Sequence, residues 1–185
     1  MWLKVDVGPE PFEMAAEEWL LREQAGDAGA LVAFQGMVRA CDHAHPLAAL
    51  HLEHYPGLTE SEIARIAQEA GRRWPITACR VVHRVGRLEP GEGIVLVLTA
   101  SPHRRASFAA AEYLMDYLKT EAPFWKREEF ADGSHQWVEA RHSDSEARQR
   151  WELHGPDSEV KRVDLQPRVA GFDFPLLQSM VKDGF

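Results

Sequence analysis

The chain has 185 residues, 45% of them hydrophobic and 27% charged, which suits one well-buried globular domain and argues against disorder over most of its length. Its 21 Lys and Arg stand against 29 Asp and Glu, so the net charge of −8 leaves no sequence-wide basic field to hold nucleic acid. No apolar run approaches the roughly 20 residues of a membrane span, and any anion site must be local.

Apolar periodicity predicts a strand, a helix and two further strands in the first 55 residues. Residues 3–7 alternate between apolar and polar, and the apolar residues of 12–20 recur at helical spacing. Residues 30–39 form an apolar run of strand length with Gly36 near its end, where the missing side chain lets a backbone or a ligand come close. Residues 47–55 alternate again and predict another strand.

The segment after the turn at YPGLTE predicts a long helix. Thr59 and Glu62 have the spacing of a capping box, and Pro75 marks the end of the helix. One apolar stripe follows the helical period: Ile63, Ile66, Ala67, Ala70 and Trp74.

Two hairpins and a second long helix are expected after Pro75. Residues 77–88 and 94–101 are predicted strands joined around EPGEG, and the second is apolar enough to be central. Residues 124–130 and 135–140 flank the turn sequence ADGS and predict the other hairpin. Residues 104–121 have the helical period, with these side chains directed inward: Phe108, Ala111, Met115 and Leu118.

The order of these elements predicts an α+β domain rather than alternating βαβ units. Ser143 and Glu146 are spaced to cap a last short helix that ends near Trp151. Residues 152–185 contain Pro and Gly with little periodicity. We therefore expect a single domain over residues 1–151 and a C-terminal extension over residues 152–185.

The sequence YLKTEAPFWKRE, residues 117–128, carries two lysines seven positions apart. Lys119 falls in the last turn of a predicted helix, Pro123 ends that helix, and Lys126 begins an extended segment. The two ammonium groups are therefore expected to converge across a corner, with Phe124 and Trp125 shielding them from water. The alternative is a helix end with two solvated lysines.

Cationic side chains at the ends of two apolar strands are candidates for anion binding. SPHRRASF places His103, Arg104 and Arg105 where a strand gives way to a helix, and helix N-terminal amides together with guanidinium groups suit phosphate or carboxylate. Arg39 lies at the end of another apolar strand. The alternatives are ion pairs of the two helix arginines with acids such as Glu112, and a solvated Arg39.

The sequence offers no metal or nucleotide motif. It has no HExxH, GxGxxG or P-loop, and no carboxylate at ligand spacing with a histidine pair. We therefore expect loop and surface histidines at His43, His45, His51, His54 and His83. Cys41 and Cys79 lack CxxC or zinc spacing, which favours free thiols in a reducing compartment and a cytoplasmic protein.

A series of motifs between residues 32 and 151 occurs in the order and spacing of one family. The motifs are FQGMVR, LEHYPGLTE, RWP, HRVGRLEPGE, SPHRRASF, YLKTEAPFWKRE and WVEAR with a terminal RW. On these motifs the chain resembles the large, catalytic subunit of molybdopterin synthase. YLKTEAPFWKRE is the most specific of them.

The resemblance implies a fold, a reaction and partners. The fold would be an α/β hammerhead-type domain with an additional small antiparallel β-sheet. The reaction would convert cyclic pyranopterin monophosphate into molybdopterin, with two sulfurs supplied by the C-terminal thiocarboxylate of a small ubiquitin-like subunit, so that no cofactor is needed. Two large subunits would form a central dimer with a small subunit at each outer end of the heterotetramer, and each pocket would be shared across the dimer.

The resemblance also implies the site residues. Lys119 and Lys126 match the family's essential lysines, and we expect Lys119 to assist proton transfer and Lys126 to stabilise negative charge. His103 and Arg104 would reach into the neighbouring subunit's pocket. The full set of matching substrate contacts is Met37, Val38, Arg39, His103, Arg104, Lys119, Lys126, Arg127 and Glu128, with no metal ligand.

The sequence departs from the family pattern around these residues and at its end. Met37 stands where close bacterial relatives often have lysine, and Pro102 and Arg105 flank the matched pair. The extension after Trp151 does not end in Gly-Gly; its residues 172–185 either occupy the groove for the partner's tail or form a surface-packed or disordered extension. Two rivals to the enzyme interpretation are a non-catalytic scaffold that binds a ubiquitin-like sulfur carrier and a histidine metal-site hydrolase.

Overall fold

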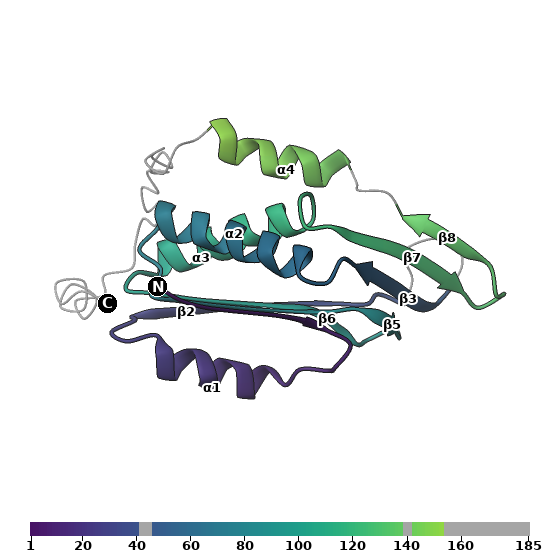
Figure 1. The fold of residues 1–185 in the computed structure, drawn as a ribbon, viewed down its shortest axis with the longest axis horizontal. Coiled ribbons are helices and arrows are strands. Elements are labelled where there is room, and N and C mark those ends of the chain that lie inside the picture. Colours follow the sequence, from purple (N-terminus) through teal and green to yellow (C-terminus); the bar gives the residue numbers. More distant parts are fainter. Residues whose placement is uncertain (41–45, 139–141, 154–185) are drawn as a thin grey trace, which may run out of the picture.

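Two four-stranded β-sheets organise the chain (Figure 1). The computed structural model describes residues 1–40, 46–138 and 142–153. Residues 152 and 153 of the expected extension belong to the last described helix, and its residues 154–185 lie outside the described residues. The first sheet has the order β1 (Trp2–Gly8), β4 (Ala78–Arg84), β6 (Gly93–Ser101) and β2 (Ala30–Met37). The second has the order β5 (Gly86–Leu88), β3 (Leu47–His54), β7 (Phe124–Phe130) and β8 (His135–Val138).

Helices cover both faces of the first sheet. Figure 1 shows α2 (Leu58–Arg73) and α3 (Arg104–Leu118) on one face, α1 (Met14–Gln24) on the other, and α4 (His142–Leu153) above the α2 and α3 layer. The main core lies between the first sheet and the helices α2 and α3, and it contains Ile63, Ile66, Val81, Val97 and Leu114. Among the strands of the described residues, only β1 and β4 pair in parallel, and the second sheet is antiparallel throughout. The predicted α+β class with a small antiparallel sheet is confirmed.

The strand expected over residues 77–88 is divided between the two sheets. β4 ends at Arg84, and Gly86 has a φ of 86°, in the left-handed region that favours glycine. The chain therefore turns, and β5 pairs with β3 instead of continuing beside β6. β4 and β6 do pair antiparallel, as the hairpin prediction required. This turn places the end of β4 at the junction of the two sheets.

The second predicted hairpin is present. β7 and β8 pair antiparallel, and Gly133 between them has a φ of 81°. The Asp132 carboxylate accepts hydrogen bonds from the backbone N–H of Ser134 at 2.9 Å and from its hydroxyl at 2.6 Å. The turn thereby aligns the strand that carries Lys126.

The predicted capping box at the start of α2 is wrong. The N-cap residue is Gly57, and its backbone N–H donates a hydrogen bond to the Glu60 carboxylate at 2.6 Å, so Glu60 takes the place predicted for Glu62. The Thr59 hydroxyl instead donates to the carbonyl oxygen of Pro123 at 3.3 Å. This bond ties the start of α2 to the segment that leads into β7.

The inward direction predicted for Phe108 is also wrong. Phe108 is 63% exposed, whereas the small residues Ser107 and Ala110 are fully buried in the face that α3 turns to the sheet. The Ser107 hydroxyl donates to the carbonyl oxygen of Thr99 in β6 at 2.7 Å. The small side chains and this hydrogen bond let α3 approach the sheet closely. The buried face of the helix therefore includes Ser107, and the next residue, Phe108, points to solvent.

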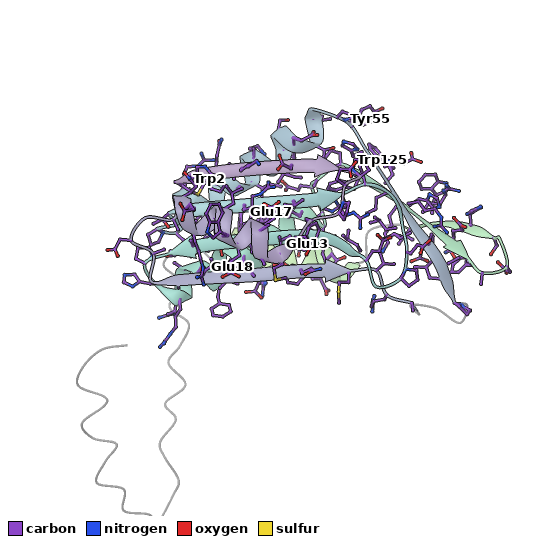
Figure 2. The ribbon with its side chains drawn as sticks, turned by 90° about the horizontal axis from the view of Figure 1, so that it is seen from below. Trp2, Glu13, Glu17, Glu18, Tyr55 and Trp125 are labelled. Atoms are coloured by element: carbon purple, nitrogen blue, oxygen red, sulfur yellow. The ribbon has the colours of Figure 1, made fainter. Side chains whose placement is uncertain are left out.

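A buried arginine anchors α1 on the opposite face. The Arg80 side chain is almost fully buried in β4 and donates to the Glu17 carboxylate at 2.6 Å and to the Asp6 carboxylate of β1. Figure 2 looks onto this face, with Glu17 on the helix that crosses the strands. A buried guanidinium needs such partners, because its charge is costly in an apolar interior.

Candidate functional site

A cavity of about 620 Å³ lies where the two sheets meet the C-terminal end of α3. Its polar lining consists of Arg39, His83, Lys119, Lys126 and Asp144. The apolar lining includes Phe34, Leu50, Leu52, Val95, Met115, Leu118 and Phe124. An apolar concavity of this size with a few convergent polar groups is typical of a small-molecule site.

The two lysines of YLKTEAPFWKRE line this cavity together. Lys119 follows the last residue of α3, and Lys126 is the third residue of β7. Pro123 lies in the short connection between them, and its carbonyl is held by Thr59. The corner predicted from the sequence therefore brings both ammonium groups to one cavity, while their chemical roles stay predictions.

The aromatic pair between the lysines does not shield both of them. Phe124 lines the cavity, but Trp125 lies on the other face of β7, because neighbouring residues of a strand point to opposite faces. Trp125 packs edge-on against Tyr55 with ring centroids 5.3 Å apart, as Figure 2 shows for these two labelled side chains. The Lys119 side chain is 55% exposed and lies 3.3 Å from the Asp144 carboxylate. The predicted shielding by Trp125 is thus wrong.

The end of β2 forms another wall. A bulge between Gly36 and Met37 shifts the pairing with β6, and Met37 and Arg39 line the cavity beyond it. Val38 between them is buried, and its backbone N–H donates to the carbonyl oxygen of Glu92 at 2.9 Å. A Cβ atom on Gly36 would lie 2.9 Å from a methyl group of Val95. The glycine therefore permits the close approach that its place in the sequence predicted.

The predicted anion-binding pair lies at the far end of α3. His103 precedes this helix of 15 residues and Arg104 begins it, so about 22 Å of helix separates them from Lys119. Both side chains are exposed and neither lines the cavity of its own chain. Glu112, the acid considered as an ion-pair partner for the arginines at the start of this helix, forms an ion pair with Arg150 at 2.8 Å. The contribution of His103 and Arg104 to a neighbouring subunit's pocket stays a prediction.

The last two predicted contacts, Arg127 and Glu128, do not line the cavity either. The Arg127 guanidinium lies 5.9 Å from the ring centroid of Trp137 in β8. Glu128 is buried and pairs across the strands with Leu50 and Gln136. Their substrate contacts also stay predictions.

Sequence reasoning missed two polar residues of the cavity, His83 and Asp144. His83 is buried at the end of β4, where a surface histidine was expected, so that prediction is wrong. Its position at the end of a continuously apolar strand is the signal that could have identified it. Asp144 has no comparable signal, because its proximity to Lys119 depends on how α4 packs on α3.

Burial keeps two titratable groups neutral. It lowers the pKa of His83 to about 4 and raises the pKa of the Cys79 thiol to about 12. The Cys79 thiolate, the form that would attack as a nucleophile, is therefore scarce at pH 7. Cys79 is a free thiol, as the sequence predicted. Cys41 and the histidines at 43 and 45 lie outside the described residues.

His51 and His135 lie edge to face, with ring centroids 6.5 Å apart. His51 lies 2.6 Å from the Glu129 carboxylate, and this hydrogen bond lowers the pKa of Glu129. Across residues 1–40, 46–138 and 142–153, no group of three or more His, Cys, Asp and Glu side chains could hold a metal ion. In the same part of the chain, no helix is both long enough and apolar enough to span a membrane.

The chain is similar in sequence to molybdopterin synthase catalytic subunits from several bacteria. The chain is 51% identical over 148 residues to the molybdopterin synthase catalytic subunit of Mesorhizobium japonicum, covering 80% of this chain and 92% of that protein. It is 49% identical over 148 residues to the molybdopterin synthase catalytic subunit of Escherichia coli strain K12, covering 80% and 97%. The structure matches the molybdopterin biosynthesis MoaE protein from Burkholderia ambifaria with a TM-score of 0.70 at 47% identity, covering 82% of this chain and 99% of that one.

These similarities place the chain in the class of molybdopterin synthase catalytic subunits. The family described as MoaE protein matches residues 7–121, and the chain belongs to this family.

Proposed function

We propose that this chain is the large, catalytic subunit of a molybdopterin synthase. It converts cyclic pyranopterin monophosphate into molybdopterin by transfer of two sulfurs from a thiocarboxylated small subunit. The observation that carries the proposal is the convergence of Arg39, Lys119 and Lys126 on one apolar cavity of about 620 Å³. A phosphate-bearing ring system needs cations that hold its charge, and an apolar wall that receives its rings.

The two lysines have different chemical roles. Lys119, exposed and 3.3 Å from Asp144, positions the incoming thiocarboxylate and assists proton transfer. Lys126 is held on β7 and stabilises negative charge that develops on the substrate. The attacking sulfur comes from the partner, so the reaction uses neither a resident cofactor nor the buried Cys79.

The partner is a small ubiquitin-like sulfur carrier whose C-terminal tail enters the cavity. The relatives are named catalytic subunits, which supports a second subunit in the working enzyme. We place two copies of this chain at the centre of a heterotetramer, with the exposed His103 and Arg104 of each copy completing the pocket of the other. The free, buried Cys79 suits the reducing cytoplasm.

The test is reconstitution of the full chain with the thiocarboxylated small subunit and cyclic pyranopterin monophosphate, followed by assay of the dithiolene product. We expect product from the wild type and a loss of at least about 100-fold for Lys119→Ala, the usual scale for a positioned proton-transfer group. Lys4→Ala, on the first strand, is the matched control and should retain wild-type turnover. Absence of product from the wild type would refute the enzyme function and favour the non-catalytic scaffold. Full turnover by Lys119→Ala would refute the proposed role of that lysine.

A further inference from the structure

One wall of the cavity is a buried imidazole held in a single orientation. His83 is 9% exposed, and its ring stacks on that of Phe124 with centroids 3.8 Å apart and 18° between the planes. Both rings line the cavity that also receives Lys119 and Lys126. The stacking connects the end of β4 in the first sheet to the start of β7 in the second, so this wall is built where the two sheets meet.

The backbone sets the tautomer of this imidazole. Nδ1 lies 2.9 Å from the carbonyl oxygen of Arg84, and because a carbonyl oxygen only accepts, Nδ1 carries the hydrogen. The ring is neutral at pH 7, so Nε2 has an unshared electron pair. In the part of the chain that the structure describes, no residue forms a hydrogen bond with Nε2. Because His83 lines the cavity, Nε2 is the acceptor that this side chain can offer to a ligand there.

Among the side chains that line this cavity, few can accept a hydrogen bond. Arg39, Lys119 and Lys126 have side chains that only donate, and the Asp144 carboxylate is already close to Lys119. A ligand that carries both a phosphate and a nitrogen heterocycle needs donors for the phosphate and an acceptor for its ring N–H groups. Of the neutral lining side chains, the imidazole of His83 is suited to accept from such an N–H group.

We propose that His83 is a substrate-positioning residue whose Nε2 accepts a hydrogen bond from an N–H group of the pterin ring. This inference rests on the proposed function. The cations hold the phosphate, while the bond to His83 selects the orientation in which the ring enters the cavity. An analogue without that N–H group would leave Nε2 buried without a partner, which disfavours its binding.

Two amide substitutions separate the two nitrogens of the ring. In His83→Asn the amide nitrogen replaces Nδ1 and can still donate to the Arg84 carbonyl, but nothing replaces Nε2. In His83→Gln the amide oxygen reaches the place of Nε2 and can accept. We expect His83→Asn to raise the KM for cyclic pyranopterin monophosphate about 10-fold to 100-fold, the usual effect of an unmet buried hydrogen bond, and to leave kcat within about twofold. His83→Gln should restore most of the lost affinity.

The assay uses the reconstituted enzyme with the thiocarboxylated small subunit. Inhibition by inorganic phosphate should be equal in the wild type and His83→Asn, because only the cations bind it. An unchanged KM in His83→Asn, a fall in kcat alone, or a His83→Gln variant as impaired as His83→Asn would overturn the inference. If wild-type enzyme yields no product, the proposed function fails, whereas a normal wild type with a normal His83→Asn variant overturns the role of His83 alone.

A measurement without substitutions covers the case in which His83→Asn does not fold. In full-length protein labelled with ¹⁵N at histidine, the Nε2 resonance of His83 should move toward that of a hydrogen-bonded acceptor when cyclic pyranopterin monophosphate is added. Inorganic phosphate alone should not move it. An Nε2 resonance that ignores the pterin would overturn the proposal.

Discussion

The cavity is lined by a neutral imidazole and by cationic side chains. His83 stays uncharged because burial lowers its pKa, and the nearby His54 lowers it further. Arg39 approaches from the end of β2, so each of these groups comes from a different part of the chain. Polar groups that only donate are thereby combined in a single site with two acceptors, the His83 imidazole and the Asp144 carboxylate.

His83 should make the protein less stable in mild acid. Its pKa is about 4 in the folded protein and 6.5 in the unfolded chain, so the unfolded chain takes up the proton first as the pH falls. Stability is complete above pH 6.5 and is lost toward pH 4, by about 2 kcal/mol at pH 5. Urea unfolding at pH 7.5 and pH 5 measures this difference, which His83→Gln should largely remove. An equal pH dependence in both proteins would contradict the assignment.

Gly36 should tolerate no side chain. The Cβ atom of Gly36→Ala would meet the Val95 methyl group at 2.9 Å, which we expect to cost about 1–3 kcal/mol and to narrow the cavity. Gly8→Ala is the matched control, because nothing lies within 4 Å of its Cβ position. Urea unfolding and the affinity for cyclic pyranopterin monophosphate test both effects, and equal stability of the two variants would contradict the steric account.

At the scale of elements, Trp151 anchors the end of α4, in addition to the ion pair of Arg148 with Glu121 at 2.8 Å. The Trp151 ring packs edge-on against Trp74 and Tyr113, at 5.5 and 5.6 Å between ring centroids, and its N–H donates to the Asp116 carboxylate at 2.7 Å. The same helix brings Asp144 to Lys119. The packing of Trp151 near the C-terminal end of α4 thus helps to place Asp144, near its other end, beside Lys119.

Trp151→Ala should therefore detach α4. We expect a loss of about 2–4 kcal/mol in the free energy of unfolding and faster amide hydrogen exchange along the helix, because an aromatic contact and a hydrogen bond disappear together. Trp19→Ala removes an exposed tryptophan from α1 and should change stability by less than about 0.5 kcal/mol. Unaltered exchange in α4 would show that other contacts hold it.

At the scale of the whole molecule, the length of α3 separates the cationic groups into two sets. Lys119 lies at one end with the cavity, while His103 and Arg104 lie exposed at the other. If both sets act on one substrate, the second must come from another copy of the chain. A two-fold dimer supplies it twice, once for each cavity.

Mixed dimers test this arrangement. Lys119→Ala and Arg104→Ala should each be inactive alone, whereas re-associated mixtures should regain about a quarter of wild-type turnover, since half of the dimers are mixed and each mixed dimer has one intact pocket. A mixture of Lys119→Ala and Lys126→Ala is the control, because both substitutions fall in the same chain's cavity and no pocket is intact. Recovery in the control, or none in the first mixture, would contradict a shared pocket.

Elements whose signals are local could be predicted from the sequence alone. The stripe from Ile63 to Ala70 with Pro75 after it, the turn at Gly133 and the glycine near the end of β2 depend on neighbours a few residues away, and the structure shows each of them. The identity of the cations could also be inferred from the motifs, because Lys119 and Lys126 flank one corner.

How distant segments meet is visible only in the folded chain. The transfer of β5 to the second sheet, the stacking of His83 on Phe124 and the approach of Asp144 to Lys119 join residues that lie far apart in the sequence. Such contacts depend on sheet pairing and helix packing rather than on local periodicity. Strand alternation, a local rule, turned Trp125 away from the cavity where the sequence had pointed to it as a shield. The stacking of Phe124 on His83, which built that wall of the cavity, depends on the meeting of two distant strands.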